Sequence, residues 1–259
     1  MTTLGVHVNR SEIALGVGPG PDGAQRSGSS PLPREPEDAW LAGHLAELLQ
    51  AGWDGIHDVS LDLGSLIDGW LHSDAPERLR RVTVVRISPS FRTIQAPFDA
   101  WPVRIREVID GGWLHVPGGV DLHGGTGPAL DLSTLDRAIE HAERAGSSAI
   151  CLSSVGALLD PSWETAAAEH LMRRAPSLPI VMAHEVGGRR FHERETAALL
   201  NAALLRAVDG VLKEILPAAA AVGARISLVR ADGSRTSEQE ARSLPVQLFG
   251  TQLAMVAQG

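Results

Sequence analysis

The sequence predicts an α/β protein in which a mainly parallel sheet is covered by helices on both faces. From residue 100 onward, short apolar runs alternate with segments of helical periodicity. This β-α-β-α order is typical of parallel sheets, whose crossover connections are helices. One of these runs, "SAICLSS" at 148–154, is almost continuously apolar, as in strands that are buried on both faces.

The N-terminal third contains fewer clear signals. A hairpin is predicted over residues 4–17, because two β-prone runs flank the polar turn at 9–11. Residues 18–38 are rich in Gly, Pro and Ser, which predicts a flexible loop. A helix is expected from Asp38, and strands are expected at "GIHDVSLDL" and "RVTVVRIS".

The next elements follow in a regular order. Pro102 suits the first turn of the helix "WPVRIREVI", and "GWLHVP" is the strand after it. The helix over 133–145 has Ser133 at its start, close to a capping box, and Gly146 at its end. The strand 148–154 then leads to a helix that starts at Asp160 and Pro161.

The C-terminal elements complete the pattern. "LPIVMA" is a strand, and a long helix from His192 to Ala221 is expected to be interrupted at Pro217. "ARISLVR" is a further strand, and "PVQLFG" is expected as a last short one.

Composition excludes several classes of protein. The formal net charge of −8 argues against nonspecific binding of nucleic acid. No apolar run approaches the roughly 20 residues that a bilayer span requires. The single cysteine, Cys151, excludes an internal disulfide and lies in an apolar run, where an inert thiol is expected. We therefore expect a cytoplasmic protein with small-molecule or protein partners and no membrane or nucleic-acid partner.

Ligands of open α/β sheets bind at the carboxyl ends of the strands, and three segments qualify here. They are the loop after "GWLHVP", with Asp121 and His123, the segment "SSVGALLD", and His184 with Glu185 after "LPIVMA". Two imidazoles and a carboxylate suit a divalent metal, so Asp121, His123 and His184 are candidate ligands. The alternative is that His184 bonds a backbone carbonyl and His123 lies in solvent.

The segment after the last of these strands concentrates ionisable groups. Gly187 and Gly188 allow a tight turn or a close approach of the backbone to a ligand. Helical spacing places His192 and Glu195 on one face and Glu193 on another, so only one glutamate can point to a given site. Acidic residues in a first helical turn also offset the helix dipole, which explains them without a site.

Four motifs resemble the hydantoinase/oxoprolinase family. They are "VVRISPSFRTIQAPFDAWP", "GGVDLHGGTGPALD", "HEVGGRRFHERETAALLNAAL" and "VRADGSRTSEQEARSLPV", in this order over most of residues 80–250. The family contains ATP-dependent 5-oxoprolinases, N-methylhydantoinases and the large subunits of acetone-type carboxylases. The resemblance implies the first lobe of an actin/sugar-kinase/Hsp70-like fold, as a single lobe over 1–259.

The nucleotide motifs of the family are degenerate. Its phosphate loop corresponds to "GVHVNRSEIA", where His7 replaces the aspartate and Asn9-Arg10 replace two glycines. Its Gly-Thr-Thr segment corresponds to "LDLGSLIDGW", and a second nucleotide-binding lobe is not in the sequence. ATP is therefore not expected as a cofactor, and a divalent metal is the cofactor left open.

Three functions compete. The first is an ATP-independent enzyme that hydrolyses, cyclises or isomerises a lactam, cyclic amide or related carbonyl compound. His184, Glu185, Glu195 and His192 would be its catalytic groups, with Arg189, Arg190, Gly187 and Gly188 binding the substrate. The second is a non-catalytic subunit or regulator that docks through the apolar segment "PVQLFGTQLAMVA", which also suits a homodimer. The third, a split ATPase, is least favoured.

Overall fold

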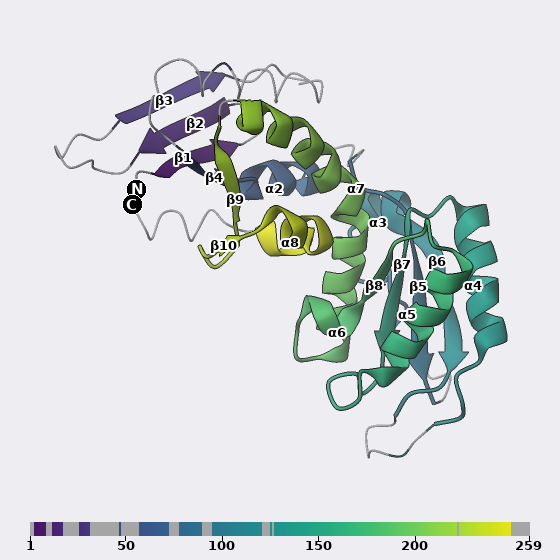
Figure 1. The fold of residues 1–259 in the computed structure, drawn as a ribbon. Coiled ribbons are helices and arrows are strands. Elements are labelled where there is room, and N and C mark those ends of the chain that lie inside the picture. The colour runs from purple at the N-terminus through teal and green to yellow at the C-terminus, as the bar shows by residue number, and fades with distance from the viewer. Residues whose placement is uncertain are drawn as a thin grey trace. The chain divides into compact units, whose positions relative to one another are not determined.

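The computed structural model describes residues 3–8, 12–17, 26–31, 47, 57–72, 78–89, 95–120, 125, 127–221 and 223–249. The chain divides into two compact units (Figure 1). One comprises Met1–Ser73 with Ala207–Gly259, and the other Asp74–Arg206. The long helix α7 (Phe191–Ala221) contributes residues to both units. Within the described ranges, no helix is both long and apolar enough to cross a membrane.

The first unit contains a six-stranded mixed sheet in the order β10-β9-β4-β1-β2-β3. Strands β1, β4 and β9 run parallel, and β2, β3 and β10 each pair antiparallel with a neighbour. The strands are β1 (Thr3–Val8), β2 (Glu12–Val17), β3 (Arg26–Pro31), β4 (Asp58–Asp62), β9 (Arg225–Val229) and β10 (Arg235–Thr236). Its other described elements are α2 (Gly64–His72), α8 (Glu238–Ser243), the 3-10 helix η1 (Pro245–Leu248) and the C-terminal part of α7.

The second unit contains a four-stranded, wholly parallel sheet in the order β6-β5-β7-β8. The strands are β5 (Val82–Ser88), β6 (Asp110–Pro117), β7 (Ala149–Ser154) and β8 (Ile180–Met182). The helices are α3 (Val103–Ile109), α4 (Leu132–Ala145), α5 (Ser162–Arg174), α6 (Ala183–Val186) and the start of α7.

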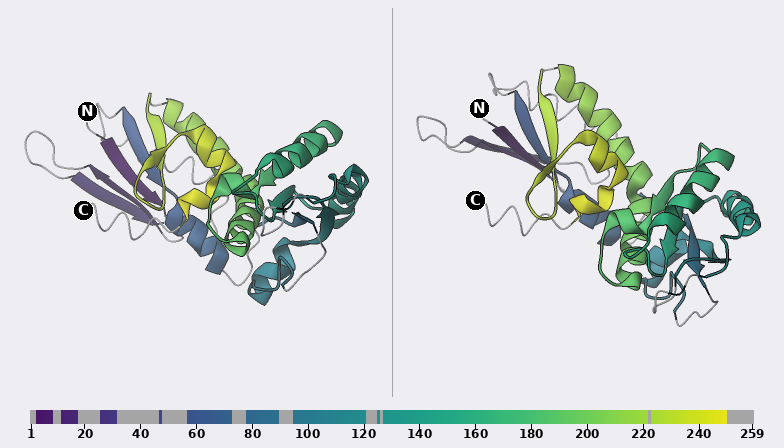
Figure 2. Two further views of the ribbon diagram at one scale, coloured as in Figure 1. Left: turned by 90° about the horizontal axis from the view of Figure 1, so that it is seen from below. Right: turned by 60° about the horizontal axis from the view of Figure 1, so that its bottom comes forward.

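Helices pack on both faces of this parallel sheet. Ile87 and Leu152 point to one face, where they form a buried core with Leu135 of α4 and Leu171 of α5. The views of Figure 2 show α4 and α5 beside these strands. Side chains alternate across a strand, so Arg86 points to the opposite face, where it contacts α7. The predicted parallel, helix-covered sheet is confirmed for this unit.

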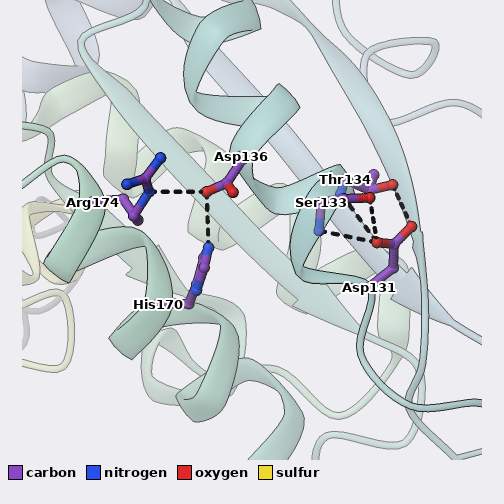
Figure 3. A network of polar contacts seen from close by, with 6 residues as sticks. All are labelled: Asp131, Ser133, Thr134, Asp136, His170 and Arg174. Carbon is purple, nitrogen blue, oxygen red and sulfur yellow. Dashed lines mark hydrogen bonds and ion pairs between the residues drawn. The ribbon is translucent and has the colours of Figure 1, made fainter.

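Local signals explain the ends of α4. Asp131 is the N-cap, because its carboxylate accepts the backbone N–H groups of Ser133 and Thr134. Figure 3 shows this cap beside a second cluster, in which Asp136 of α4 accepts hydrogen bonds from His170 and Arg174 of α5. Gly146 ends α4 with a φ of 67°, as predicted. The expected cap at Ser133 is wrong, since Asp131 lies two residues earlier and takes that role.

Several other predictions need correction. One sheet was expected, but the N-terminal strands form a separate mixed sheet. Residues 26–31, within the predicted loop 18–38, form β3 by pairing with β2. Helix α7 continues through Pro217, with Ile215 and Ala219 buried on either side. Residues 245–248 form the 3-10 helix η1 instead of a strand, starting at Pro245, which has no N–H for a ladder.

Two further points concern what the sequence left open. Helix α2 was not predicted, although it follows the confirmed strand β4 directly. The helix expected from Asp38 lies outside the described residues, apart from Glu47.

Candidate active site

The segments that follow the parallel strands meet at the carboxyl edge of the sheet. The N–H of Gly118, after β6, donates to Ser88 O at the end of β5, at 3.2 Å. The N–H of Val155, after β7, donates to Ile87 O at 3.1 Å. A Cβ on Gly119 would lie 3.3 Å from Ser154 Oγ, so the loop after β6 passes close to the end of β7.

His184 lies at this edge, in the short helix α6 that follows β8. Its side chain is 18% exposed, and its Nδ1 is 2.7 Å from Oε2 of Glu164, a side chain with no exposed surface. The same oxygen accepts the backbone N–H of His184 at 3.0 Å, and Oε1 accepts the N–H of Ser154 at 2.7 Å. One buried carboxylate therefore ties α5, the end of β7 and the start of α6 together.

This geometry sets the tautomer of His184. A carboxylate only accepts hydrogen bonds, so Nδ1 carries the proton and Nε2 carries the lone pair. Within the part of the chain that the structure describes, Nε2 of His184 has no hydrogen-bond partner. A partly exposed imidazole that is oriented by a buried carboxylate can act as a general base or as a metal ligand. The alternative, a bond from His184 to a backbone carbonyl, is not found among the described residues.

Sequence reasoning missed Glu164. It lies in the first turn of α5, where an acidic residue is explained by the helix dipole alone. Its complete burial was not readable from the pattern "SWETAAAEH", in which polar and small residues surround it. The only local signal is its place in the helix that follows β7, which directs the N-terminal end of α5 to the carboxyl edge of the sheet.

Glu195 forms a different contact from the one expected. Both of its oxygens bind Arg86, with Nε to Oε1 at 2.9 Å and Nη2 to Oε2 at 2.5 Å, and Ser153 Oγ donates to Oε1 at 2.6 Å. The guanidinium of Arg86 also makes cation–π contacts with Trp113 and Phe191, whose ring centroids lie 5.4 and 5.2 Å from its Cζ. This buried pair fixes the start of α7 on the sheet, and Glu195 has no described contact with His184.

The other predicted residues lie in α6, at the start of α7 and in the segment between them. Glu185, Arg189, Arg190 and His192 are exposed, and Arg190 is bound to Glu193. Gly187 and Gly188 have φ values of 111° and 105°, which other residues rarely adopt. A Cβ on Gly188 would lie 3.1 Å from the backbone N of Arg194, so this glycine permits the close approach.

Arg194 is a further residue that the sequence did not single out. It is 4% exposed, its Nη1 donates to the carbonyl of Arg189, and its Nε has no hydrogen-bond partner. No described carboxylate pairs with it. A buried guanidinium without a counter-ion is costly, and an anion brought by a ligand would stabilise it.

Asp121 and His123 lie outside the described residues, so the metal site that they would form with His184 stays a prediction. Among the residues that are described, no group of three or more His, Cys, Asp or Glu side chains is arranged to hold a metal. Cys151 of β7 is fully buried. Burial raises the pKa of its thiol well above the ordinary value, and the charges of Glu195 and Glu164 raise it further.

The comparisons with known proteins concern the fold. No family model and no curated protein matches the sequence. The chain is similar to the nucleotide-free structure of acetone carboxylase, an enzyme of ATP-dependent acetone carboxylation, with a TM-score of 0.69 and 12% identity. It is also similar to the ATP-dependent caprolactamase from Pseudomonas jessenii, with a TM-score of 0.69 and 13% identity.

Each of these similarities covers 95% of this chain but only 38% of the neighbour's chain. At such low identity the likeness establishes the fold alone. Both neighbours are described as ATP-dependent, and the chain has the fold of a part of each of them, consistent with the N-terminal lobe that its sequence motifs imply.

Proposed function

We propose that the chain is a cytoplasmic enzyme that acts without ATP on a lactam, cyclic amide or related carbonyl compound. The observation that carries the proposal is the pairing of His184 with the buried carboxylate of Glu164 at the carboxyl edge of the parallel sheet. The names of the structural neighbours, a caprolactamase and an acetone carboxylase, support carbonyl and lactam chemistry as the substrate class.

In hydrolysis, Nε2 of His184 takes a proton from a water molecule as its oxygen bonds to the ring carbonyl carbon. The imidazolium that forms is stabilised by Glu164. The C–N bond of the ring then breaks, and the proton on Nε2 passes to the leaving nitrogen, which restores the neutral imidazole. The reverse sequence of the same transfers closes a ring, so one site serves either direction.

Positive charge near the site suits a substrate that carries a carboxylate. Arg189 and Arg190 are exposed on the loop that leads away from His184, and Arg190 is engaged by Glu193. Arg194 lies beneath this loop without a described counter-ion. We assign binding of an anionic substrate group to Arg189 and Arg194, with Gly187 and Gly188 allowing the loop to approach it.

The absence of an ATP requirement is proposed from the position of His7. The resemblance places His7 where the family has the aspartate of its phosphate loop. Here His7 binds Oδ2 of Asp62, whose Oδ1 accepts the N–H of Gly64. Both carboxylate oxygens of Asp62 are thus engaged within the protein. This carboxylate therefore does not fit the role of holding magnesium-bound water beside a phosphate.

Binding of a divalent metal is a second role that His184 supports, since Nε2 carries a lone pair. Asp121 and His123 would be its other ligands. Metal analysis of the purified protein tests this role separately from turnover.

The test is turnover of a panel of lactams, hydantoins and 5-oxoproline without nucleotide, followed by mass spectrometry. We expect conversion of at least one compound by the wild type, and a loss of about 10²- to 10⁴-fold in His184→Ala. His170→Ala is the matched control, because His170 of α5 also pairs with a carboxylate, that of Asp136 in α4, but is not part of the candidate site.

Three outcomes would contradict the proposal. Undiminished turnover in His184→Ala would exclude His184 as the base, and turnover only with ATP would exclude the ATP-independent reaction. No turnover, together with a stoichiometric protein partner in native mass spectrometry, would favour the non-catalytic subunit. Such a partner, or a second copy of the chain, would use the apolar segment that begins at Pro245 and continues beyond the described residues.

A further inference from the structure

A second group of polar side chains lies in the first unit, at the ends of β1 and β4. The two strands are parallel, and their register places His7 directly beside Asp62. Paired residues on neighbouring strands point to the same face, so the imidazole and the carboxylate meet. Nδ1 of His7 lies 2.8 Å from Oδ2 of Asp62.

Asp62 is held rigidly. Its side chain has no exposed surface, and its second oxygen, Oδ1, accepts the backbone N–H of Gly64 at 2.8 Å. A buried carboxylate in this geometry keeps the proton of His7 on Nδ1, because a carboxylate only accepts. Nε2 then carries the lone pair. The hydrogen bond that His7 donates to Asp62 also raises the pKa of His7, whereas burial lowers it.

Ser65 completes the group. Its Oγ lies 3.2 Å from Nε2 of His7, within hydrogen-bond reach, and it is the second residue of α2. Only Leu63 separates α2 from β4, so a sharp strand-to-helix turn presents the hydroxyl. Ser65 is 7% exposed, whereas the side chain of His7 is 28% exposed, so the group is open to solvent on the histidine side.

The three residues have the relationships that nucleophilic catalysis requires. A hydroxyl contacts the basic nitrogen of an imidazole, and the other nitrogen is bound by a buried carboxylate. The first N–H groups of a helix have no acceptor within the helix and point toward charge at its N-terminus. The N–H of Gly64 is already bound by Asp62, and the dipole of α2, which is nine residues long, favours a negative oxygen that develops beside Ser65.

We propose that Ser65, His7 and Asp62 form a serine nucleophile site that accepts acyl groups from esters or activated amides. Oγ of Ser65 bonds to the acyl carbon while its proton moves to Nε2 of His7. The bond from that carbon to the leaving alcohol or amine breaks, and the leaving group takes the proton from His7. Water, deprotonated by His7, then attacks the acyl-serine, which releases the carboxylic acid and restores the Ser65 hydroxyl.

The test uses a fluorophosphonate probe, which a catalytic serine attacks at phosphorus with release of fluoride. The full-length native protein is labelled, digested and mapped by mass spectrometry. We expect the label on Ser65, its absence when labelling is done in urea, and labelling slowed by about 10²- to 10⁴-fold in His7→Ala and Asp62→Asn. Ser60→Ala is the matched control, since Ser60 is also buried in the first unit but lies outside the group.

Native protein without label on Ser65 would overturn the proposal, and this result needs no variant to fold. Label on Ser65 at an unchanged rate in folded His7→Ala, checked by circular dichroism, would also overturn it. The readout and the residues differ from those of the lactam assay on His184, so the two proposals succeed or fail separately.

Discussion

The carboxylate of Glu164 has no exposed surface and accepts the Nδ1–H of His184 at 2.7 Å, so a residue of α5 fixes the imidazole that follows β8. In the sequence, the rest of α5 and the strand β8 lie between the two residues. Their contact converts a histidine in a glycine-rich segment into an oriented base. It also explains why a fully buried carboxylate is tolerated, since three N–H groups donate to it.

The buried pair of Arg86 and Glu195 predicts a large effect on stability. Glu195→Ala leaves the guanidinium of Arg86 buried and without a counter-ion, which should lower the free energy of unfolding by about 3–5 kcal/mol. Urea denaturation measures it. Glu193→Ala, on the exposed side of the same helix turn, should change stability by less than about 0.5 kcal/mol. Equal effects of the two substitutions would show that the pair does not hold α7 on the sheet.

Asp131 predicts a pH dependence at acid pH. Hydrogen bonds from Thr134, and then from Ser133, lower the pKa of its carboxyl to about 2 from the ordinary 3.8. A lowered pKa means that the stabilisation is complete above pH 3.8 and is lost as the pH falls through about 2. The stability difference between wild type and Asp131→Ala, measured by urea denaturation, should therefore shrink over this window.

The control for Asp131 is Glu143→Ala, which removes an exposed carboxylate from the last turn of the same helix. The stability difference between wild type and Glu143→Ala should not shrink as the pH falls. A constant difference between wild type and Asp131→Ala from pH 7 to pH 2 would contradict the capping role.

For His7 we predict a pH dependence of stability that is opposite in sign to that of Asp131. The pKa of His7 is raised, chiefly by the hydrogen bond that this residue donates to Asp62, with the charge of Glu12 adding to the effect. The contribution of the pair to stability is therefore complete below the ordinary pKa of 6.5 and is lost as the pH rises through the raised value. Relative to His7→Gln, the wild type should gain most stability at mildly acid pH and progressively less above pH 6.5.

His72→Gln controls for this measurement, because His72 pairs with Asp68 on the exposed side of α2, in the same unit. Its effect should be small at every pH. If the advantage of wild type over His7→Gln grew with rising pH instead, the proposed bond between His7 and Asp62 would be wrong.

Cys151 should be unreactive in the folded protein. Its thiol is fully buried, and burial raises its pKa well above the ordinary value, so little thiolate exists near neutral pH. Ellman's reagent at pH 8 should modify the thiol only after unfolding in urea. Rapid modification of the native protein would show that the sheet opens at β7.

Much of the fold was predictable because the signals were local. The apolar run of β7 and the helical pattern of α4 specify these elements without tertiary information. Strand β3 has the sequence "RSGSSP", which contains no apolar alternation, and it is a strand because it pairs with β2. Likewise, Pro245 ends extended pairing where the apolar letters of "PVQLFG" suggest a strand.

The place of the candidate site could be predicted from the sequence, but the partners of its residues could not. Parallel topology places the carboxyl ends of β7 and β8 together, so His184 was found from the strand that precedes it. Glu164 was missed because the burial of a first-turn glutamate depends on the packing of α5 against β8. Ser65 and His7 are 58 positions apart, and no short motif can reveal a contact that depends on strand register.

The most direct test of the proposed function is the steady-state kinetics of Glu164→Gln on a lactam that the wild type converts without ATP. The variant keeps the size of the side chain but removes the charge that holds the Nδ1 proton and stabilises the imidazolium. We predict that kcat falls by about 10- to 100-fold while KM stays within about twofold, with Glu164→Asp recovering part of kcat. An unchanged kcat in folded Glu164→Gln would contradict a catalytic role for His184 at this edge of the sheet.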